Sequence, residues 1–128
     1  MANRFFIVIS VVLAALIFPR ISAFSQDEIS GRAIAISGDT LRLKNEEDKS
    51  EIEVRLWGID APETNQHCET RTGRSIDCGI LAKNALKATI RRKILTCVDF
   101  DKNEEGTITA LCYLGDKILN SMVVRSGW

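Results

Sequence analysis

The sequence predicts a small, mostly β Greek-key barrel with one helix inserted after its third strand. The chain has 128 residues, enough for one domain. Apolar and polar residues alternate in several short runs, as in half-buried strands, and one longer run repeats its apolar residues at helical spacing. Five short strands with a helix between the third and the fourth are typical of the five-stranded OB-fold barrel, an α+β fold.

Residues 1–25 have the pattern of a secretory signal peptide. Arg4 is the only early charge, and an apolar run interrupted by a single serine covers residues 5–18. As a helix this run would reach roughly 21 Å, short of the ~30 Å hydrocarbon core of a bilayer. Small residues follow, so we expect cleavage after Ala23 or after Ser25, with an uncleaved anchor helix as the alternative.

Cleavage would leave residues 27–128 as one exported domain, periplasmic or secreted, with no stable membrane association. The whole chain has 17 basic and 17 acidic residues, and loss of Arg4 and Arg20 leaves 15 against 17, a net charge of −2. A protein that binds nucleic acid through its overall field would be basic, so any phosphate contact must come from a local site. The sequence leaves the oligomeric state open, with a monomer as the expectation.

Each predicted element follows from a local pattern. The third strand alternates Ile52, Val54 and Leu56 with charged residues. The helical run spaces its apolar residues three or four apart and ends in Lys and Arg, which the helix dipole favours there. In chain order we expect strands at Ile29–Ser37, Asp39–Leu43 and Glu51–Trp57, a helix at Cys78–Lys93, strands at Ile94–Phe100 and Thr107–Leu114, and the start of an amphipathic helix at Lys117–Trp128.

Four cysteines in an oxidising compartment predict two disulfides. Cys97 and Cys112 lie symmetrically about the polar turn "DKNEEG", so an antiparallel hairpin brings them face to face. Cys68 and Cys78 then remain to close the loop between them. There is no CxxC pair and only one histidine, so we do not expect a zinc site.

Two carboxylates are expected to meet at one end of this barrel. Asp39 lies at a strand-to-strand turn, and Asp60 lies at the exit of the third strand. Such neighbours can share a hard cation, because Ca²⁺ prefers carboxylate and carbonyl oxygens. Glu63 follows three residues later, and a third carboxylate near a metal can orient or deprotonate water. Arg55 alternates with buried neighbours, so its guanidinium should point outward, where it could hold two phosphate oxygens.

Simpler explanations exist for the same residues. Asp-Thr and Asp-Ala-Pro-Glu are common turn sequences, and a surface salt bridge with Glu51 or Glu53 would also account for Arg55. The basic cluster "KATIRRK", residues 87–93, is expected to be a solvated helix end rather than a nucleic-acid patch, given the balanced charge.

Three motifs resemble the staphylococcal nuclease (thermonuclease) family. They are "GDTLRL" at Gly38–Leu43, "VRLWGIDAPET" at Val54–Thr64 and "GDKILNSMVVRSGW" at Gly115–Trp128, in this order and around this helix. The resemblance runs from about Gly31 to the last residue, and the four cysteines resemble the exported bacterial branch of the family. It implies an OB-fold barrel with helices and Ca²⁺-dependent hydrolysis of DNA and RNA phosphodiesters.

The resemblance also implies a role for each site residue. Asp39 and Asp60 match the metal carboxylates, and Ala61 matches the residue whose backbone carbonyl joins the metal. Glu63 matches the general base or water-orienting residue of the family, and Arg55 matches its first phosphate-binding arginine. The implied substrate is single-stranded or flexible nucleic acid.

This chain departs from the family pattern in three places. Ser37 replaces an aspartate two residues before the first metal aspartate, which removes one nearby negative charge. Thr107 replaces the second catalytic arginine, and an arginine in that role can contribute roughly 10³ to 10⁵ in rate. Lys102 lies in the same turn as a less favoured substitute. The family also continues past Trp128 into a further helix, so we expect a truncated C-terminal helical region.

Two functions therefore follow from the sequence. The first is an exported Ca²⁺-dependent phosphodiesterase, a nuclease weakened by Thr107. The alternative is a catalytically silent OB-fold module that binds nucleic acid or a protein. The motif at residues 55–64 favours the first, and Thr107 favours the second or a weak form of the first.

Overall fold

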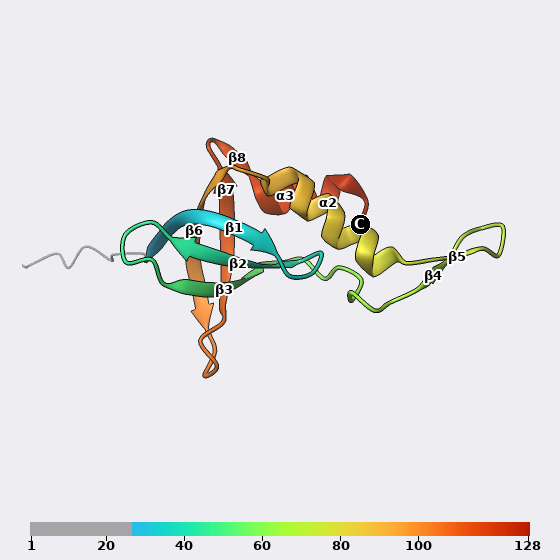
Figure 1. The fold of residues 1–128 in the computed structure, drawn as a ribbon, viewed down its shortest axis with the longest axis horizontal. Coiled ribbons are helices and arrows are strands. Elements are labelled where there is room, and N and C mark those ends of the chain that lie inside the picture. The colour runs from blue at the N-terminus through green and yellow to red at the C-terminus, as the bar shows by residue number, and fades with distance from the viewer. Residues whose placement is uncertain (1–26) are drawn as a thin grey trace, which may run out of the picture.

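Five strands curl into a barrel, and two helices pack along one side of it (Figure 1). The structure, a computed structural model, describes residues 27–128, so the predicted signal peptide lies outside the described residues. The elements are β1 (Glu28–Ala35), β2 (Thr40–Asn45), β3 (Glu51–Leu56), β4 (Cys68–Glu69), β5 (Ser75–Ile76), α2 (Cys78–Ile90), β6 (Ile94–Lys102), β7 (Ile108–Leu114), β8 (Lys117–Ile118) and α3 (Leu119–Ser126).

The strand order confirms the predicted five-stranded barrel. The sheet runs β3-β2-β1-β6-β7, and each of these neighbours is antiparallel. A parallel pairing of β3 with β7, with Val54 opposite Ile108, closes the sheet on itself. Helix α2 lies between the third and fourth long strands, as expected. The strands β4, β5 and β8 were not predicted, because two residues are too few to show an alternating pattern.

Alternation along the strands separates the core from the outer face. Leu41 and Leu43 in β2, with Val54 in β3, are fully buried, whereas Arg42 and Arg55 point outward. Each buried aliphatic side chain contributes about 1.5 to 3 kcal/mol relative to exposure. Burial of these side chains therefore stabilises the barrel that holds the outward-facing residues in place.

The helices cover the barrel through short apolar faces. Leu86 and Ile90 of α2 and Leu119 and Val123 of α3 join the barrel core. Helix α2 ends at Ile90, three residues before the predicted end. The chain turns there because Arg92 takes a left-handed backbone conformation (φ 59°) before β6 begins. No helix within residues 27–128 is both long and apolar enough to cross a membrane.

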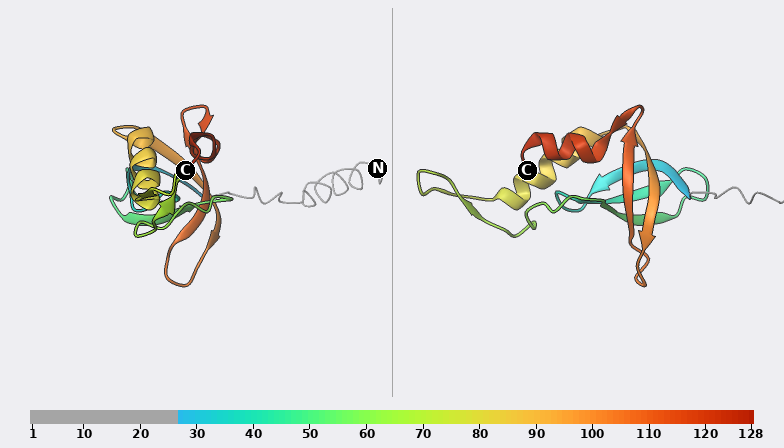
Figure 2. Two further views of the ribbon diagram at one scale, coloured as in Figure 1. Left: turned by 90° about the vertical axis from the view of Figure 1, so that its right-hand side faces the viewer. Right: turned by 180° about the vertical axis from the view of Figure 1, so that it is seen from behind.

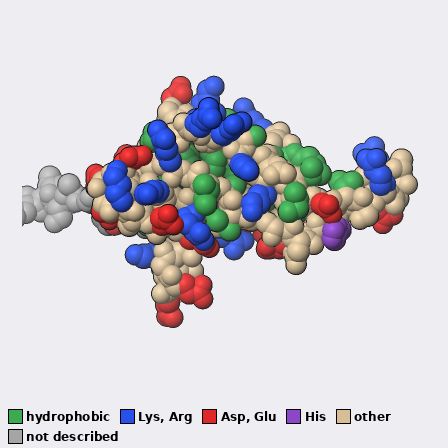
Figure 3. Space-filling view, in the orientation of Figure 1, with side chains coloured by type: hydrophobic (Ala, Val, Ile, Leu, Met, Phe, Trp, Pro, Cys, Tyr) green, Lys and Arg blue, Asp and Glu red, His purple; other side chains and the backbone are tan. Residues whose placement is uncertain are grey.

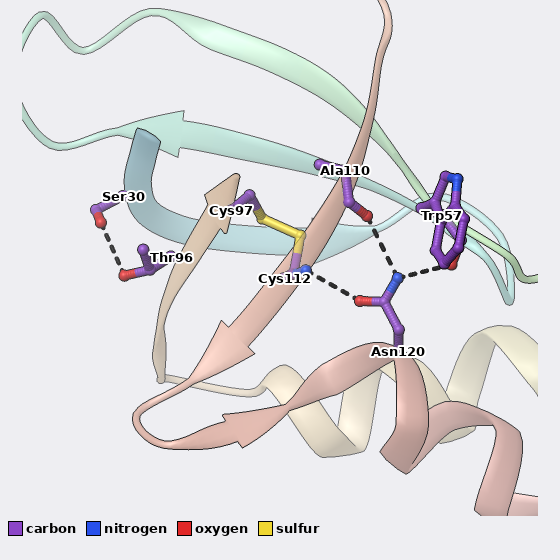
Figure 4. Close-up of a disulfide and its surroundings, with 7 residues drawn as sticks. All are labelled: Ser30, Trp57, Thr96, Cys97, Ala110, Cys112 and Asn120. Carbon is purple, nitrogen blue, oxygen red and sulfur yellow. Dashed lines mark hydrogen bonds between the residues drawn. A yellow bond between two sulfur atoms is a disulfide. The ribbon is translucent and has the colours of Figure 1, made fainter. Parts of the chain in front are cut away.

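Two disulfides join the expected cysteine pairs. Cys97 in β6 lies directly opposite Cys112 in β7, and both are completely buried (Figure 4). Cys68–Cys78 ties β4 to the first residue of α2 and closes the long loop that projects from the barrel (Figure 2). The Cys97–Cys112 bridge thus joins two neighbouring strands of the barrel, and the Cys68–Cys78 bridge fixes the end of the loop at the start of α2.

Peptide mapping without reduction should yield one fragment that joins Cys97 to Cys112 and another that joins Cys68 to Cys78. Because each bridge restricts the unfolded chain, reduction should lower the free energy of unfolding by about 2 to 4 kcal/mol per disulfide. Urea unfolding with and without reductant measures this change. A fragment that links Cys78 to Cys97, or equal unfolding midpoints in the two conditions, would contradict the assignment.

Candidate metal and phosphate site

Asp39 is a buried carboxylate held in the turn between β1 and β2. Its Oδ1 accepts hydrogen bonds from the hydroxyl groups of Ser37 (2.6 Å) and Thr40 (2.9 Å). Its Oδ2 accepts a longer bond from the backbone N–H of Ala61 (3.4 Å). The side chain is only 9% exposed, so its position is fixed by these donors rather than by solvent. Oδ2 is the less satisfied oxygen, and it is the one that faces Arg55.

Arg55 contacts both of the carboxylates that were expected to meet, Asp39 and Asp60. Its Nη2 lies 3.4 Å from Asp60 Oδ1 and 3.8 Å from Asp39 Oδ2. The β2–β3 register explains this arrangement, because Arg55 pairs with Thr40, the residue after Asp39. The alternative salt bridge to Glu51 or Glu53 does not form, since Arg55 is paired with the two aspartates instead.

Small residues seat α2 against both loops of the site. Gly38 leaves no space for a side chain, because a β-carbon there would lie 2.7 Å from the β-carbons of both Ala61 and Ala82. Gly79, in the first turn of α2, packs on the backbone of Glu63 so closely that a β-carbon would overlap the Glu63 carbonyl oxygen. The helix therefore positions the loop before β2 and the loop after β3 at once.

The backbone of Glu63 is fixed, while its carboxylate is exposed. The Glu63 N–H donates to Gln66 Oε1 (3.1 Å), and its carbonyl accepts the Gln66 N–H (2.8 Å). The structure thus brings together Asp39, Asp60 and Arg55, with Ala61 beside them. It does not place the Glu63 carboxylate in a hydrogen bond or ion pair with any of these described residues.

Two threonines lie at the start of β7, near Arg55: Thr109 is the second residue of the strand, and Thr107 immediately precedes the strand. Thr109 lies directly opposite Arg55 in the parallel β3–β7 pairing, and Thr107 comes two residues earlier. Ile108 and Ala110 are buried, so Thr109 lies on the outward side that Arg55 occupies. Thr107 lies in the preceding turn, where its N–H donates to Asn103 Oδ1 (2.9 Å).

Asn120 is a supporting residue that the sequence analysis missed. This buried side chain accepts the N–H of Cys112 at Oδ1 (3.0 Å), and its Nδ2 donates to the carbonyl oxygens of Trp57 (2.9 Å) and Ala110 (3.3 Å) (Figure 4). It thereby joins α3 to β7 and to the first residue after β3. A single asparagine in a helical pattern gives no signal of this role; only the fold reveals it.

The donors present fit a hard cation that is only partly enclosed by protein. Asp39 Oδ2, Asp60 and the carbonyl of Ala61 are all oxygen ligands of the kind Ca²⁺ prefers. Within residues 27–128, no three His, Cys, Asp or Glu side chains come close enough to form a complete metal cage. Two carboxylates and one carbonyl would leave most of the six to eight coordination positions of Ca²⁺ to water and substrate oxygens.

Comparison with known proteins adds one finding to this geometry. Residues 53–128 match the sequence model of the family described as "Staphylococcal nuclease homologue". A comparison with curated proteins finds no match. The matched region begins in β3 just before Arg55 and includes the Asp60–Glu63 loop, both helices and β7.

Asn120→Ala should destabilise the protein, because it removes the side-chain oxygen that accepts the buried Cys112 N–H. An unsatisfied buried donor costs about 1 to 3 kcal/mol, so the free energy of unfolding should fall by about that amount. Thermal or urea unfolding measures the loss. Asn84→Ala on the exposed face of α2 is the matched control and should change stability little. Equal effects of the two substitutions would contradict the bracing role.

Proposed function

Because the chain belongs to the staphylococcal nuclease family, we propose that it is a Ca²⁺-dependent phosphodiesterase that hydrolyses DNA or RNA. The family supports nuclease-type chemistry and a nucleic-acid substrate. The convergence of Asp39 and Asp60 on one guanidinium nitrogen of Arg55 is the observation that carries the proposal. Two carboxylates beside a guanidinium at the end of a strand can bind a metal ion and a phosphate group, the carboxylates holding the metal and the guanidinium the phosphate.

Each residue has a distinct part in this proposal. Asp39, Asp60 and the Ala61 carbonyl hold Ca²⁺, which when bound neutralises negative charge on the phosphoryl oxygens. Arg55 exchanges its carboxylate partners for the substrate phosphate, which its guanidinium can bind through two parallel hydrogen bonds. Glu63, which is exposed and follows Asp60 by three residues, orients or deprotonates the attacking water.

A second function has one specific observation in its favour. Thr107 occupies the position of the second family arginine, and neighbouring Glu104 and Glu105 are acidic and exposed. Without that second positive charge, the transition state loses a major source of stabilisation. A catalytically silent domain that binds nucleic acid or protein through the same barrel is therefore the alternative.

We also propose that the domain is exported to the periplasm or the medium after removal of residues 1–25. The two disulfides support this placement, because such bonds persist in oxidising compartments. After cleavage the domain is expected to act as a monomer without stable membrane association.

Millimolar Ca²⁺ should raise the melting temperature of the protein, because a ligand that binds only the folded state stabilises it by mass action. Asp60→Ala should abolish the shift, and its side chain is 91% exposed, so the variant should fold. Asp116→Ala, an exposed aspartate in the β7–β8 turn, is the matched control and should retain the shift. A shift that survives Asp60→Ala would place the cation elsewhere, and no shift in the wild type would favour the silent module.

Thr107→Arg should raise phosphodiesterase activity, by about 10² or more, because it supplies a second guanidinium in the turn just before β7. Adding Glu63→Ala to this variant should remove the gain, because water activation would be lost. The measurement is the rate of single-stranded DNA cleavage with Ca²⁺, and with a chelator as the blank.

The wild-type rate decides between the two functions. If wild type already cleaves fast and Thr107→Arg changes nothing, another residue supplies the charge and the role given to position 107 is wrong. If wild type and both variants are folded and none cleaves, the protein is a binding module and the enzyme proposal fails.

A further inference from the structure

A basic groove runs between α2 and β1, away from the aspartates and Arg55. Its volume is about 420 Å³. The floor is apolar and includes Ala33, Ile34 and Ile90, and no Asp or Glu lines it. The cations that line it come from α2 and the turn that follows: Lys83, Lys87, Arg91 and Arg92.

A second groove continues this surface across the outer face of the sheet. It measures about 200 Å³ and shares Ala33 and Ile34 with the first groove. The β1–β2 register places Arg32 beside Lys44 and Ile34 beside Arg42. Figure 3 shows the result, with hydrophobic side chains near the centre of this face and Lys and Arg side chains around them.

The two grooves differ in how far their cations are neutralised. On the sheet, Arg42 forms an ion pair with Glu53 (3.8 Å), and Lys44 lies opposite Glu51. The cations of α2 and its following turn form no salt bridge with any residue in the described part of the chain. Positive charge that no acidic residue neutralises is therefore concentrated along α2, and an anionic partner would be attracted most strongly there.

The neutral total charge conceals this basic face. Six acidic residues lie instead at two turns: Glu46, Glu47 and Asp48 between β2 and β3, and Asp101, Glu104 and Glu105 at the β6–β7 end. Glu51 and Glu53 lie beside the second groove and offset part of its charge, but not that of the groove along α2. Both turns project at ends of the barrel, so they do not cover the groove along α2 (Figure 1). The field over this face is therefore positive although the whole chain is balanced.

We propose that the two grooves form a second binding surface for single-stranded nucleic acid, separate from the residues around the cleaved phosphate. The cations of α2 would contact successive phosphates, and Ile34, 61% exposed between the grooves, would offer an apolar face to a base. Among the residues that line the two grooves, Ile34 is the one large hydrophobic residue that is exposed, which provides little area for insertion into a lipid bilayer, whereas two connected grooves suit an extended chain. The inference rests on the proposed function for the class of ligand.

The position of this surface would lead a bound strand toward the candidate site. Arg42 and Glu53 form an ion pair across the outer face, and Thr40 pairs with Arg55 on the same face. On the helix side, Lys83 follows Ala82 in α2. Ala82 packs against Gly38, the residue before Asp39, so Lys83 lies near the Asp39 turn. Nucleotides beyond the cleaved bond could thus be held while the scissile phosphate lies at Arg55.

The test is binding of a fluorescent single-stranded oligonucleotide of about 20 nucleotides, longer than the roughly 4 to 16 that one OB fold covers. Anisotropy is measured with a chelator present, so that binding is observed without cleavage. The double variant Lys87→Gln/Arg91→Gln should weaken binding about tenfold or more at low salt. It should also reduce the slope of log K against log salt by about 1.4, because each lost phosphate contact accounts for about 0.7.

The matched control is Lys117→Gln/Arg125→Gln, which removes one exposed lysine and one exposed arginine outside both grooves and should bind like the wild type. Equal weakening by the two double variants, or no weakening by the groove variant, overturns the proposal. Loss of binding to phosphatidylglycerol vesicles in the groove variant, with DNA binding unchanged, also overturns it in favour of a membrane surface. Cleavage with Ca²⁺ is assayed separately: a protein that binds through the groove but does not cleave refutes the enzyme and leaves this surface intact.

Discussion

The candidate site depends on close contact between α2 and the two loops that carry the acids. There is no room for a β-carbon at Gly38 or at Gly79, so the helix backbone lies directly on the Asp39 turn and on the Glu63 loop. The Cys68–Cys78 bridge holds the residue just before Gly79, which links the loop closure to this contact. A shift of α2 would therefore disturb both loops, and with them the positions of Asp39 and Glu63 relative to each other.

The strand pattern could be predicted from the sequence because it depends on alternation alone. The same alternation placed Arg55 outside the core, and hairpin symmetry placed Cys97 opposite Cys112. The early end of α2 and the short strands β4, β5 and β8 depend instead on local backbone geometry and on long-range pairing. Alternation of apolar and polar residues does not reveal either of these features.

The site was only partly predictable for a related reason. Their positions at adjacent strand ends suggested that Asp39 and Asp60 would meet, and the structure does bring both to Arg55. The role of Asn120 and the two tight glycine contacts involve residues far apart in the chain, so no local pattern reveals them. The sequence predicts that the basic cluster at residues 87–93 is solvated, and it does not show that β1 brings Ala33 and Ile34 beside Lys87, Arg91 and Arg92.

The site also combines a fixed acid with a free one. Asp39 is buried and held by three neighbouring donor groups, whereas Asp60 is almost fully exposed. The Arg55 side chain is 53% exposed, and exposed ion pairs contribute only about 0 to 1 kcal/mol, so solvent screening leaves its contacts with both acids weak. A phosphate group can displace such contacts at little cost, while Asp39 keeps its position. The arrangement therefore favours exchange of partners at Arg55 around one rigid carboxylate, which is what a site that must admit both a cation and an anionic substrate requires.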